Sequence, residues 1–138
     1  GFHFGYPQGK PAAVHSSLLG RANINPGRRT RHKEPVLAWA EVRRVPNLSG
    51  SLGGISGGPV VNEDGEIIGV SVVEARRRGR IFTAAPSGLD DMLQRGAVPK
   101  PLDSGIKFKN SINENQFFKY GEALRTQLSV SKVYCWVQ

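Results

Sequence analysis

The sequence predicts a mainly β fold, in which a small antiparallel β unit is followed by a helix and then by a short α+β extension. Three observations lead to this prediction. Before residue 86 the apolar patches are short and are separated by turn residues, which is typical of antiparallel strands. From Ser87 onward the apolar period becomes helical, and Pro99 and Pro101 then mark a linker. A chain of 138 residues suits one domain with a modest core, or one compact domain with an appendage.

Short runs rich in Val, Ile and Ala predict five or six strands before Pro86. The clearest strand segments are residues 14–22, 36–44, 59–62, 66–74 and 81–85. Residues 25–29 and 76–79 are expected to form a loop and a turn between them. Asp64-Gly65 predicts a tight hairpin, because glycine accepts the positive φ that such a turn needs.

Two helices are expected after the strands. Ser87, with Asp90 three residues later, has the form of an N-cap, and Gly96 can end the helix that follows. This helix is expected to close the β unit. A second cap is expected at Ser111 with Glu114, followed by an apolar stripe that we interpret as a packing face. The stripe consists of Phe117, Tyr120, Leu124 and Leu128.

The extension ends in residues 128–137, which alternate like a strand and stop without a turn. Such a strand has an open edge that invites pairing. The extension is therefore expected either to pack across the β unit or to pair with a second copy, which makes a homo-oligomer one candidate assembly. The predicted division is residues 1–96 for the β unit and 97–138 for the extension, with residues 98–101 as a stiff linker.

Positive charge gathers in two short clusters of a chain whose formal net charge is +8. The clusters consist of Arg28, Arg29, Arg31 and Lys33, and of Arg76, Arg77, Arg78 and Arg80. Cations of this kind can hold phosphates. The clusters lack the interleaved aromatic residues that single-strand binding favours. We interpret them as solvated loop tips, and a nucleic-acid partner is not expected.

Several classes of protein are disfavoured by what the sequence does not contain. No stretch approaches the roughly 20 apolar residues of a membrane-spanning helix, so no membrane span is expected. Cys135 is the only cysteine, which predicts neither a disulfide framework nor a zinc site. No metal and no cofactor are expected. The chain begins with Gly1 and shows no secretory signal, a start compatible with a removed signal or with a cut.

The stretch "GISGGP", residues 54–59, fits the pattern Gly-X-Ser-X-Gly around Ser56. An α/β-hydrolase elbow needs a buried strand before the serine and a helix after it. Here the preceding residues are polar and rich in glycine, and a strand follows. A phosphate-binding loop is also disfavoured, since no Lys-Ser or Lys-Thr and no helix follow. The remaining interpretation is a glycine-rich loop that presents a serine immediately before a hairpin.

This loop resembles the active-site segment of trypsin-like (chymotrypsin-fold) serine proteases, and it is especially similar to the bacterial HtrA-type members. Further segments resemble the same family: "GYPQG" at residues 5–9, "LLGR" at 18–21, "NEDGEIIGV" at 62–70 and "FTAAPSGLDDML" at 82–93. The likeness covers roughly residues 1–96. It implies that the β unit is a six-stranded antiparallel β-barrel, the second barrel of this fold, and that the helix closes it.

The resemblance also implies roles for individual residues. Ser56 would attack the scissile carbonyl of a polypeptide substrate, and the backbone N–H groups of Ser56 and Gly54 would hold the oxyanion. Residues 70–74 would pair with the substrate as an extra strand. The implied substrate-binding residues are Gly50, Ser51, Leu52, Val70, Ser71, Val72 and Val73, with Phe82 at the border of the specificity pocket. A small or apolar side chain before the scissile bond is expected.

The sequence departs from the family pattern in two ways. Ile55 stands where the family usually has Asp or Asn. In addition, the family carries its His and Asp on a first barrel, upstream of the serine, whereas the residues before Ser56 already match the second barrel. His3, His15 and His32 are the only histidines, and each is expected to be structural or solvated rather than catalytic.

Two functional hypotheses follow from these departures. In the first, the chain is the nucleophile-bearing fragment of a serine endopeptidase, inactive alone because the first barrel that carries His and Asp is absent. In the second, it is a non-catalytic protease-like barrel that binds peptides or proteins. The extension resembles no domain that we can name and lacks the length of a PDZ domain. The family resemblance is compatible with a bacterial periplasmic or secreted location.

Overall fold

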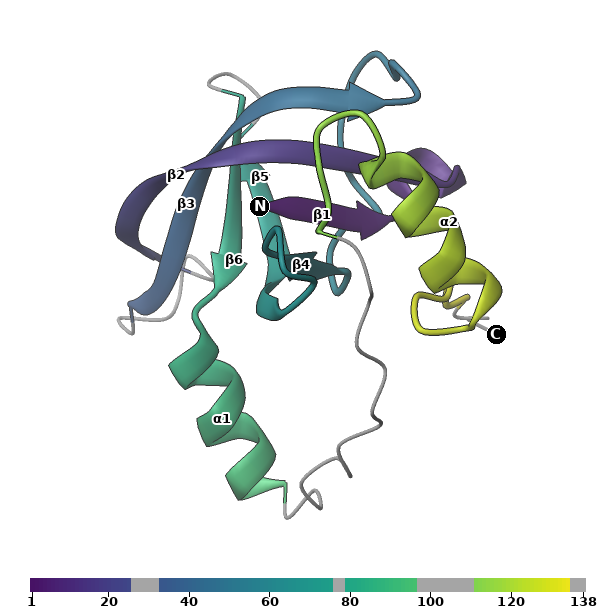
Figure 1. Cartoon of the computed structure of the whole chain (residues 1–138). Coiled ribbons are helices and arrows are strands. Elements are labelled where there is room, and N and C mark those ends of the chain that lie inside the picture. The colour runs from purple at the N-terminus through teal and green to yellow at the C-terminus, as the bar shows by residue number, and fades with distance from the viewer. Residues whose placement is uncertain (26–32, 76–78, 97–110, 135–138) are drawn as a thin grey trace.

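The computed structural model describes residues 1–25, 33–75, 79–96 and 111–134. Figure 1 shows the elements in chain order. They are β1 (Phe2–Gly5), the short 3-10 helix η1 (Pro7–Gly9), β2 (Ala12–Ile24), β3 (Glu34–Val45), β4 (Pro59–Val61), β5 (Ile67–Ala75), β6 (Arg80–Ala84), α1 (Pro86–Arg95) and α2 (Phe117–Thr126). None of the helices in these ranges is long and apolar enough to cross a membrane.

The six described strands form a closed antiparallel barrel in the order β1-β2-β3-β6-β5-β4. The ring closes where β1 pairs with β4, through Phe2 opposite Val61 and His3 opposite Val60. This arrangement confirms the predicted six-stranded antiparallel barrel followed by helical elements. Five of the six strands overlap the segments predicted from the sequence.

The sequence analysis missed the first strand, β1. Its four residues are Phe2, His3, Phe4 and Gly5, and all four are buried. A run of four residues that is buried on both faces gives no apolar and polar alternation to detect. The strand is recognisable only from its pairing with β2 on one side and with β4 on the other.

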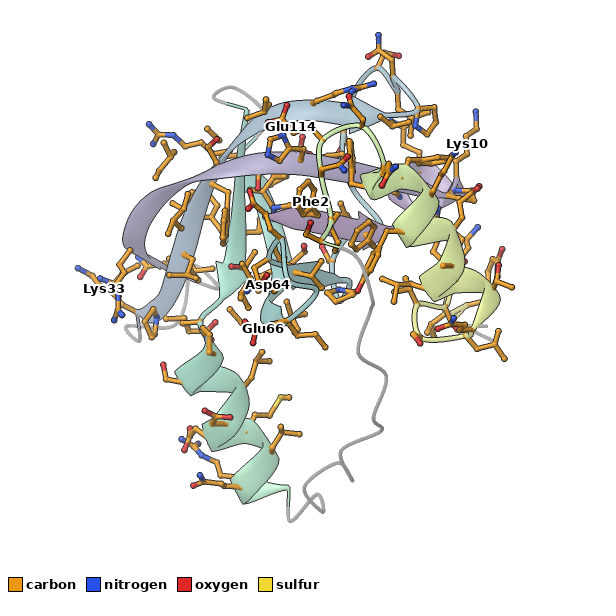
Figure 2. All side chains as sticks on the ribbon, viewed as in Figure 1. Phe2, Lys10, Lys33, Asp64, Glu66 and Glu114 are labelled. Atoms are coloured by element: carbon orange, nitrogen blue, oxygen red, sulfur yellow. The ribbon has the colours of Figure 1, made fainter. Side chains whose placement is uncertain are left out.

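The hairpin between β4 and β5 confirms the prediction made from Asp64-Gly65. Gly65 has a φ of 82°, which is in the left-handed region that glycine accepts. The Asn62 side-chain oxygen accepts hydrogen bonds from the backbone N–H groups of Asp64, at 3.0 Å, and Glu66, at 2.8 Å. Both acidic side chains lie at this turn, where Figure 2 labels them. The turn therefore fixes the register in which β4 pairs with β5.

One hydrophobic cluster lies in the barrel interior. It consists of Val14, Trp39, Leu52, Ile55, Val60 and Ile81. His3 points to the same side, with its ring edge-on to the ring of Trp39 at 5.7 Å between centroids. Because Leu52 and Ile55 belong to the loop before β4, the glycine-rich loop is anchored in the barrel core.

The second hydrophobic cluster lies on the outer face of β1 and joins the extension to the barrel. It consists of Phe2, Phe4, Ala13, Val61, Ile112, Phe117, Leu124 and Val130. The rings of Phe2 and Phe117 stack at 5.6 Å between centroids. Figure 1 shows α2 beside β1 and β2, and Figure 2 shows Phe2 under the segment that leads to α2. The predicted packing face on Phe117 and Leu124 is thus buried against the barrel wall.

The predicted start of α2 at Ser111 is wrong. The helix begins at Phe117, and Asn113 organises the turn before it. The Asn113 side-chain oxygen accepts hydrogen bonds from the N–H groups of Asn115, at 3.0 Å, and Gln116, at 3.1 Å. Gln116 takes the N-cap position without a side-chain cap, and an Asn side chain that bonds to the backbone ahead of it suits the turn before the helix.

The predicted stripe also ends earlier than expected, because α2 stops at Thr126. Leu128 has a φ of 58° and is 79% exposed. Its N–H donates to the Arg125 carbonyl at 3.0 Å, and the Ser129 N–H donates to the Leu124 carbonyl at 2.9 Å. These two bonds form a Schellman motif, so Leu128 terminates the helix instead of extending its apolar face.

The predicted strand at residues 128–137 is not formed in its described part, residues 128–134. Instead, Val130 is drawn into the outer cluster, where it is 6% exposed, and the chain then continues without strand pairing. The end of this segment and Cys135 lie outside the described residues, as do residues 98–101 and most of both basic clusters. The division at residues 96 and 97 and the homo-oligomer stay predictions.

Helix α1 follows β6 directly, but Ser87 does not cap it. Ala85 takes the N-cap position and Pro86 is the first helical residue, because the fixed φ of proline suits that position. Gly96 ends the helix as predicted. No residue of α1 is buried, and Met92 is 59% exposed. In Figure 1 the helix extends away from the barrel.

We expect Gly121→Ala to destabilise the protein although alanine favours helices. A Cβ on Gly121 would lie 2.5 Å from Cδ1 of the buried Phe4 ring, so that α2 would have to move off β1. Overpacking costs about 1–3 kcal/mol, which outweighs a gain in helix propensity of about 1 kcal/mol. Urea unfolding should show a net loss of about 1 kcal/mol.

Gly88→Ala in α1 is the matched control. A Cβ at Gly88 meets nothing within 4 Å, so this variant should gain up to about 1 kcal/mol of unfolding free energy. Changes of the same sign in both variants would contradict the close contact between α2 and β1.

Candidate functional site

The glycine-rich loop before β4 is held by consecutive turns. The N–H of Ile55 donates to the Leu52 carbonyl at 2.9 Å, and the N–H of Gly58 donates to the Ile55 carbonyl at 3.0 Å. A further bond joins the loop to η1, from the Gln8 N–H to the Gly53 carbonyl at 2.7 Å. The loop is therefore fixed at its base and along one side.

Two of its glycines are required by close approaches of the backbone. A Cβ on Gly58 would lie 2.0 Å from the Phe4 carbonyl oxygen, a distance that no side chain can adopt. Gly54 has a φ of 102°, and its Cβ would lie 2.5 Å from the Tyr6 carbonyl oxygen. The loop thus lies directly on the end of β1 and on the residues that follow it.

Ile55, the residue that departs from the family pattern, points into the barrel. It is 3% exposed and belongs to the interior cluster with Leu52. The side chain of Ser56, the next residue, is exposed on the opposite side of the loop. Burial of Ile55 therefore sets the direction in which Ser56 is presented.

The structure brings Ser56 together with the predicted substrate strand. Its Oγ donates a hydrogen bond to the Val72 carbonyl at 3.0 Å. At the neighbouring Ser71, the Gly57 N–H donates to the Ser71 carbonyl at 2.8 Å, and the Ser71 N–H donates to the Gly58 carbonyl at 2.9 Å. These bonds hold the loop of Ser56 against β5.

The backbone donors of the loop are used unevenly. The N–H groups of Ile55 and Gly57 are taken by carbonyls of the protein. Within the described part of the chain, the N–H groups of Gly54 and Ser56 have no protein acceptor. These are the two donors that the family resemblance assigns to an oxyanion. Unpaired amide N–H groups on either side of a residue can hold a negatively charged oxygen.

The far half of β5 has an edge that no described strand covers. Strand β4 pairs with β5 only as far as Val70, which lies opposite Pro59. Ser71 still bonds to Gly57 and Gly58 of the loop, and from Val72 to Ala75 the only described strand that pairs with β5 is β6. Val72 and Val73 are exposed there. An edge of this kind offers backbone groups to an additional extended chain.

The predicted specificity residues lie beside the carboxylate of Glu74, which the sequence analysis placed only on the substrate strand. Glu74 accepts hydrogen bonds from the Ser51 hydroxyl at 3.0 Å and from the Leu52 N–H at 2.8 Å. The Gly50 carbonyl accepts a hydrogen bond from Arg44 at 3.0 Å. Leu52 itself is buried in the barrel core. The signal for Glu74 was its place at the end of the predicted substrate strand.

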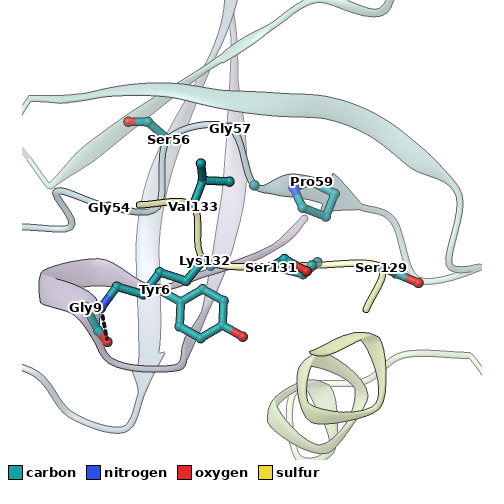
Figure 3. Close-up of a pocket in the computed structure, with 13 residues that line it drawn as sticks. Tyr6, Gly9, Gly54, Ser56, Gly57, Pro59, Ser129, Ser131, Lys132 and Val133 are labelled. Atoms are coloured by element: carbon teal, nitrogen blue, oxygen red, sulfur yellow. Dashed lines mark hydrogen bonds between the residues drawn. The ribbon is translucent and has the colours of Figure 1, made fainter. Parts of the chain in front are cut away.

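A cleft of about 400 Å³ opens beside the loop. Gly54, Ser56 and Gly57 line one wall, and residues 129–133 of the extension line another. Figure 3 shows the C-terminal segment crossing in front of the loop, with Lys132 reaching toward Gly9. Sequence reasoning did not find this wall, because more than seventy residues separate it from Ser56 and it forms no regular element.

Neither described histidine is placed to act as a base for Ser56. His3 is buried, with Nδ1 3.2 Å from the Ser71 hydroxyl and Nε2 2.6 Å from the Ser16 hydroxyl. Burial, with smaller effects of the N-terminal amino group and His15, lowers the pKa of His3 to about 3. His3 is therefore neutral at physiological pH.

His15 lies on the outer face of the barrel. Its ring stacks on Phe2 at 5.1 Å between centroids, and its Nδ1 lies 3.7 Å from a carboxylate oxygen of Glu114. Burial lowers the pKa of His15, and the nearby Glu114 partly opposes that effect. His32 lies outside the described residues.

The described ranges contain no group of three or more His, Cys, Asp or Glu residues that could hold a metal ion.

No family model matches the chain, and no curated protein matches it. Among solved structures it is similar to the inactive form of a serine-to-alanine mutant of Rv3671c from M. tuberculosis H37Rv, with 18% sequence identity and a TM-score of 0.45. The match covers 73% of this chain and 48% of that one, so the chain spans about half the length of that protein.

The buried His3 predicts a pH dependence of stability. Its folded pKa of about 3 lies below its usual value of 6.5, so the unfolded state binds the proton more tightly. The stabilising contribution is present above pH 6.5 and is lost as the pH falls toward 3. In this pH range, one such group changes the free energy of unfolding by about 1.4 kcal/mol per pH unit.

Urea unfolding of the wild type and of His3→Gln between pH 7 and pH 4.5 measures this contribution. The variant starts less stable, because Gln replaces a buried ring, but it should lose less unfolding free energy on acidification. The two proteins differ at residue 3 alone, so the difference in slope belongs to that residue. Equal slopes would contradict the buried neutral state of His3.

Proposed function

We propose that the chain is the nucleophile-bearing barrel of a trypsin-like, HtrA-type serine endopeptidase, which hydrolyses peptide bonds through an acyl-enzyme. One observation carries this proposal. The exposed Ser56 sits on a fixed loop, and the N–H groups of Gly54 and Ser56 are the loop donors without a protein acceptor among the described residues. Acyl transfer requires a nucleophile and hydrogen-bond donors for the oxyanion, and the unpaired N–H groups of Gly54 and Ser56 can serve as these donors.

The chemistry would proceed in two stages. Ser56 Oγ leaves the Val72 carbonyl, gives its proton to a base and bonds to the scissile carbonyl carbon. The carbonyl oxygen becomes an oxyanion that accepts hydrogen bonds from the N–H groups of Gly54 and Ser56. The amine then leaves with the proton, and water releases the acyl group by the same route. Loss of a single oxyanion donor lowers such rates by about 10²–10³-fold.

The substrate would lie along the open edge of β5. An extended peptide would pair with those backbone groups of residues 72–75 that are not bonded to β6, and this would place its scissile bond next to Ser56. The hydrogen bond from Ser56 to the Val72 carbonyl supports this placement, since it brings the nucleophile to the same edge.

The base would come from another part of the parent protein. His3 is buried between two serine hydroxyls, and His15 faces Glu114 on the outer surface. The chain alone is therefore proposed to be inactive, with the His and Asp supplied by a first barrel upstream in the parent.

A non-catalytic module that binds peptides or proteins is the second candidate. It is favoured by the bond of Ser56 Oγ to a backbone carbonyl, which leaves the hydroxyl unactivated, and by the open edge of β5. Strand addition to such an edge needs no nucleophile.

Labelling with a fluorophosphonate, followed by mass spectrometry of the Ser56 peptide, tests the proposal. The full product of the gene should be labelled at Ser56, whereas this chain alone should not. Ser56→Ala should abolish the label, and Ser131→Ala, a serine that lines the same cleft, should leave it unchanged. Absence of labelling in the full product would overturn the catalytic proposal in favour of the binding module. Labelling of this chain alone would show that it contains a working base.

A further inference from the structure

The cleft beside Ser56 has an uneven distribution of charge. Its described lining contains glycines, serines, Tyr6, Pro59 and two valines, and Lys132 is the one ionised side chain among them. No carboxylate lines the cleft in the described part of the chain. The unpaired N–H groups of Gly54 and Ser56 add partial positive charge to the opposite wall. The cleft thus offers hydrogen-bond donors at both walls and no balancing anion.

The position of Lys132 is set by its neighbours on both sides. Val130, two residues earlier, is buried in the outer cluster and anchors the segment to the barrel. The Lys132 ammonium donates a hydrogen bond to the Gly9 carbonyl at 3.3 Å and lies 4.5 Å from the centre of the Tyr134 ring. An ammonium has three protons, so two stay available to a ligand. Figure 3 shows this side chain lying along the cleft toward Gly9.

We propose that this cleft selects peptides that carry a carboxylate, and that Lys132 is the residue that recognises it. The carboxylate is either an Asp or Glu side chain or a free C-terminus, because both offer the same two acceptor oxygens. The proposal rests on the proposed function in one respect, since it takes the ligand of the Ser56 cleft to be a peptide. Lys132 acts here as a specificity-determining residue and takes no part in bond cleavage.

The selectivity belongs to Lys132 rather than to the overall charge of the protein. A net charge of +8 attracts any acidic peptide at long range, and this attraction is spread over the surface. Among the lysines that the structure describes, Lys132 is the one that lines the cleft. Lys119 is an exposed lysine on α2 that does not line it, so its removal changes the net charge equally and leaves the cleft intact.

The proposal can be tested by nuclear magnetic resonance. Three hexapeptides, which differ at one internal residue or at the C-terminus, are titrated into the ¹⁵N-labelled chain of 138 residues. The first has an internal Glu and an amidated end, the second has Gln in its place and an amidated end, and the third has Gln and a free C-terminus. Whichever carboxylate is recognised, its peptide should bind about three- to fivefold more tightly than the neutral one, the range of a solvated ion pair. The amide signals of Gly54, Ser56 and Lys132 should shift.

Three variants show whether Lys132 causes the preference for the carboxylate peptide. Lys132→Ala should remove the preference for the carboxylate peptide, Lys132→Arg should keep it, and Lys119→Ala should keep it as well. Equal affinity for the neutral and acidic peptides, no binding of any peptide, or a preference that survives Lys132→Ala would each overturn the proposal. Charge-selective binding without fluorophosphonate labelling of the full gene product would support the cleft specificity and reject the catalytic function. Labelling of the full gene product without charge-selective binding would support the catalytic function and reject the cleft specificity.

Discussion

The rest of the structure depends on one constraint, which is that strand β1 is buried on both of its faces. Its inward residue His3 contacts Trp39 and two serine hydroxyls of the barrel interior. Its outward residues, Phe2 and Phe4, lie in the outer cluster beneath α2. A strand of an antiparallel sheet usually has one face in water. Here residues of the extension cover the second face, and exposing the ring of Phe2 or of Phe4 to water would cost about 1.5–3 kcal/mol of folding free energy.

The candidate site is built on the end of this strand. The backbone of Gly58 passes so close to the Phe4 carbonyl that a side chain cannot stand between them, and Ile55 inserts into the core behind it. A displacement of β1 would therefore move the loop that carries Ser56. A site on a loop gains precision when rigid elements hold its neighbours, and here the holding is done by core packing and by the bonds to β5.

The barrel and the loop could be predicted from the sequence because their signals are local. Asp64-Gly65 specifies a turn by backbone sterics, and the glycines around Ser56 indicate a backbone that must pass close to its neighbours. The missed features depend on distant partners. Strand β1 has no alternation because α2 covers it. Residues 128–134, the described part of the alternating end, form no strand because Val130 is buried in the outer cluster. Glu74 and Lys132 join the site through tertiary contacts alone.

The outer cluster unites residues from the two ends of the described chain, since Phe2 and Val130 belong to it together. Contacts of such large sequence separation close a long loop, and the entropy cost of closing it slows their formation. During synthesis the phenylalanines of β1 leave the ribosome before the segment that covers them. A nascent barrel without residues 111–130 therefore exposes an apolar wall, and the outer cluster can close only after Val130 has been synthesised.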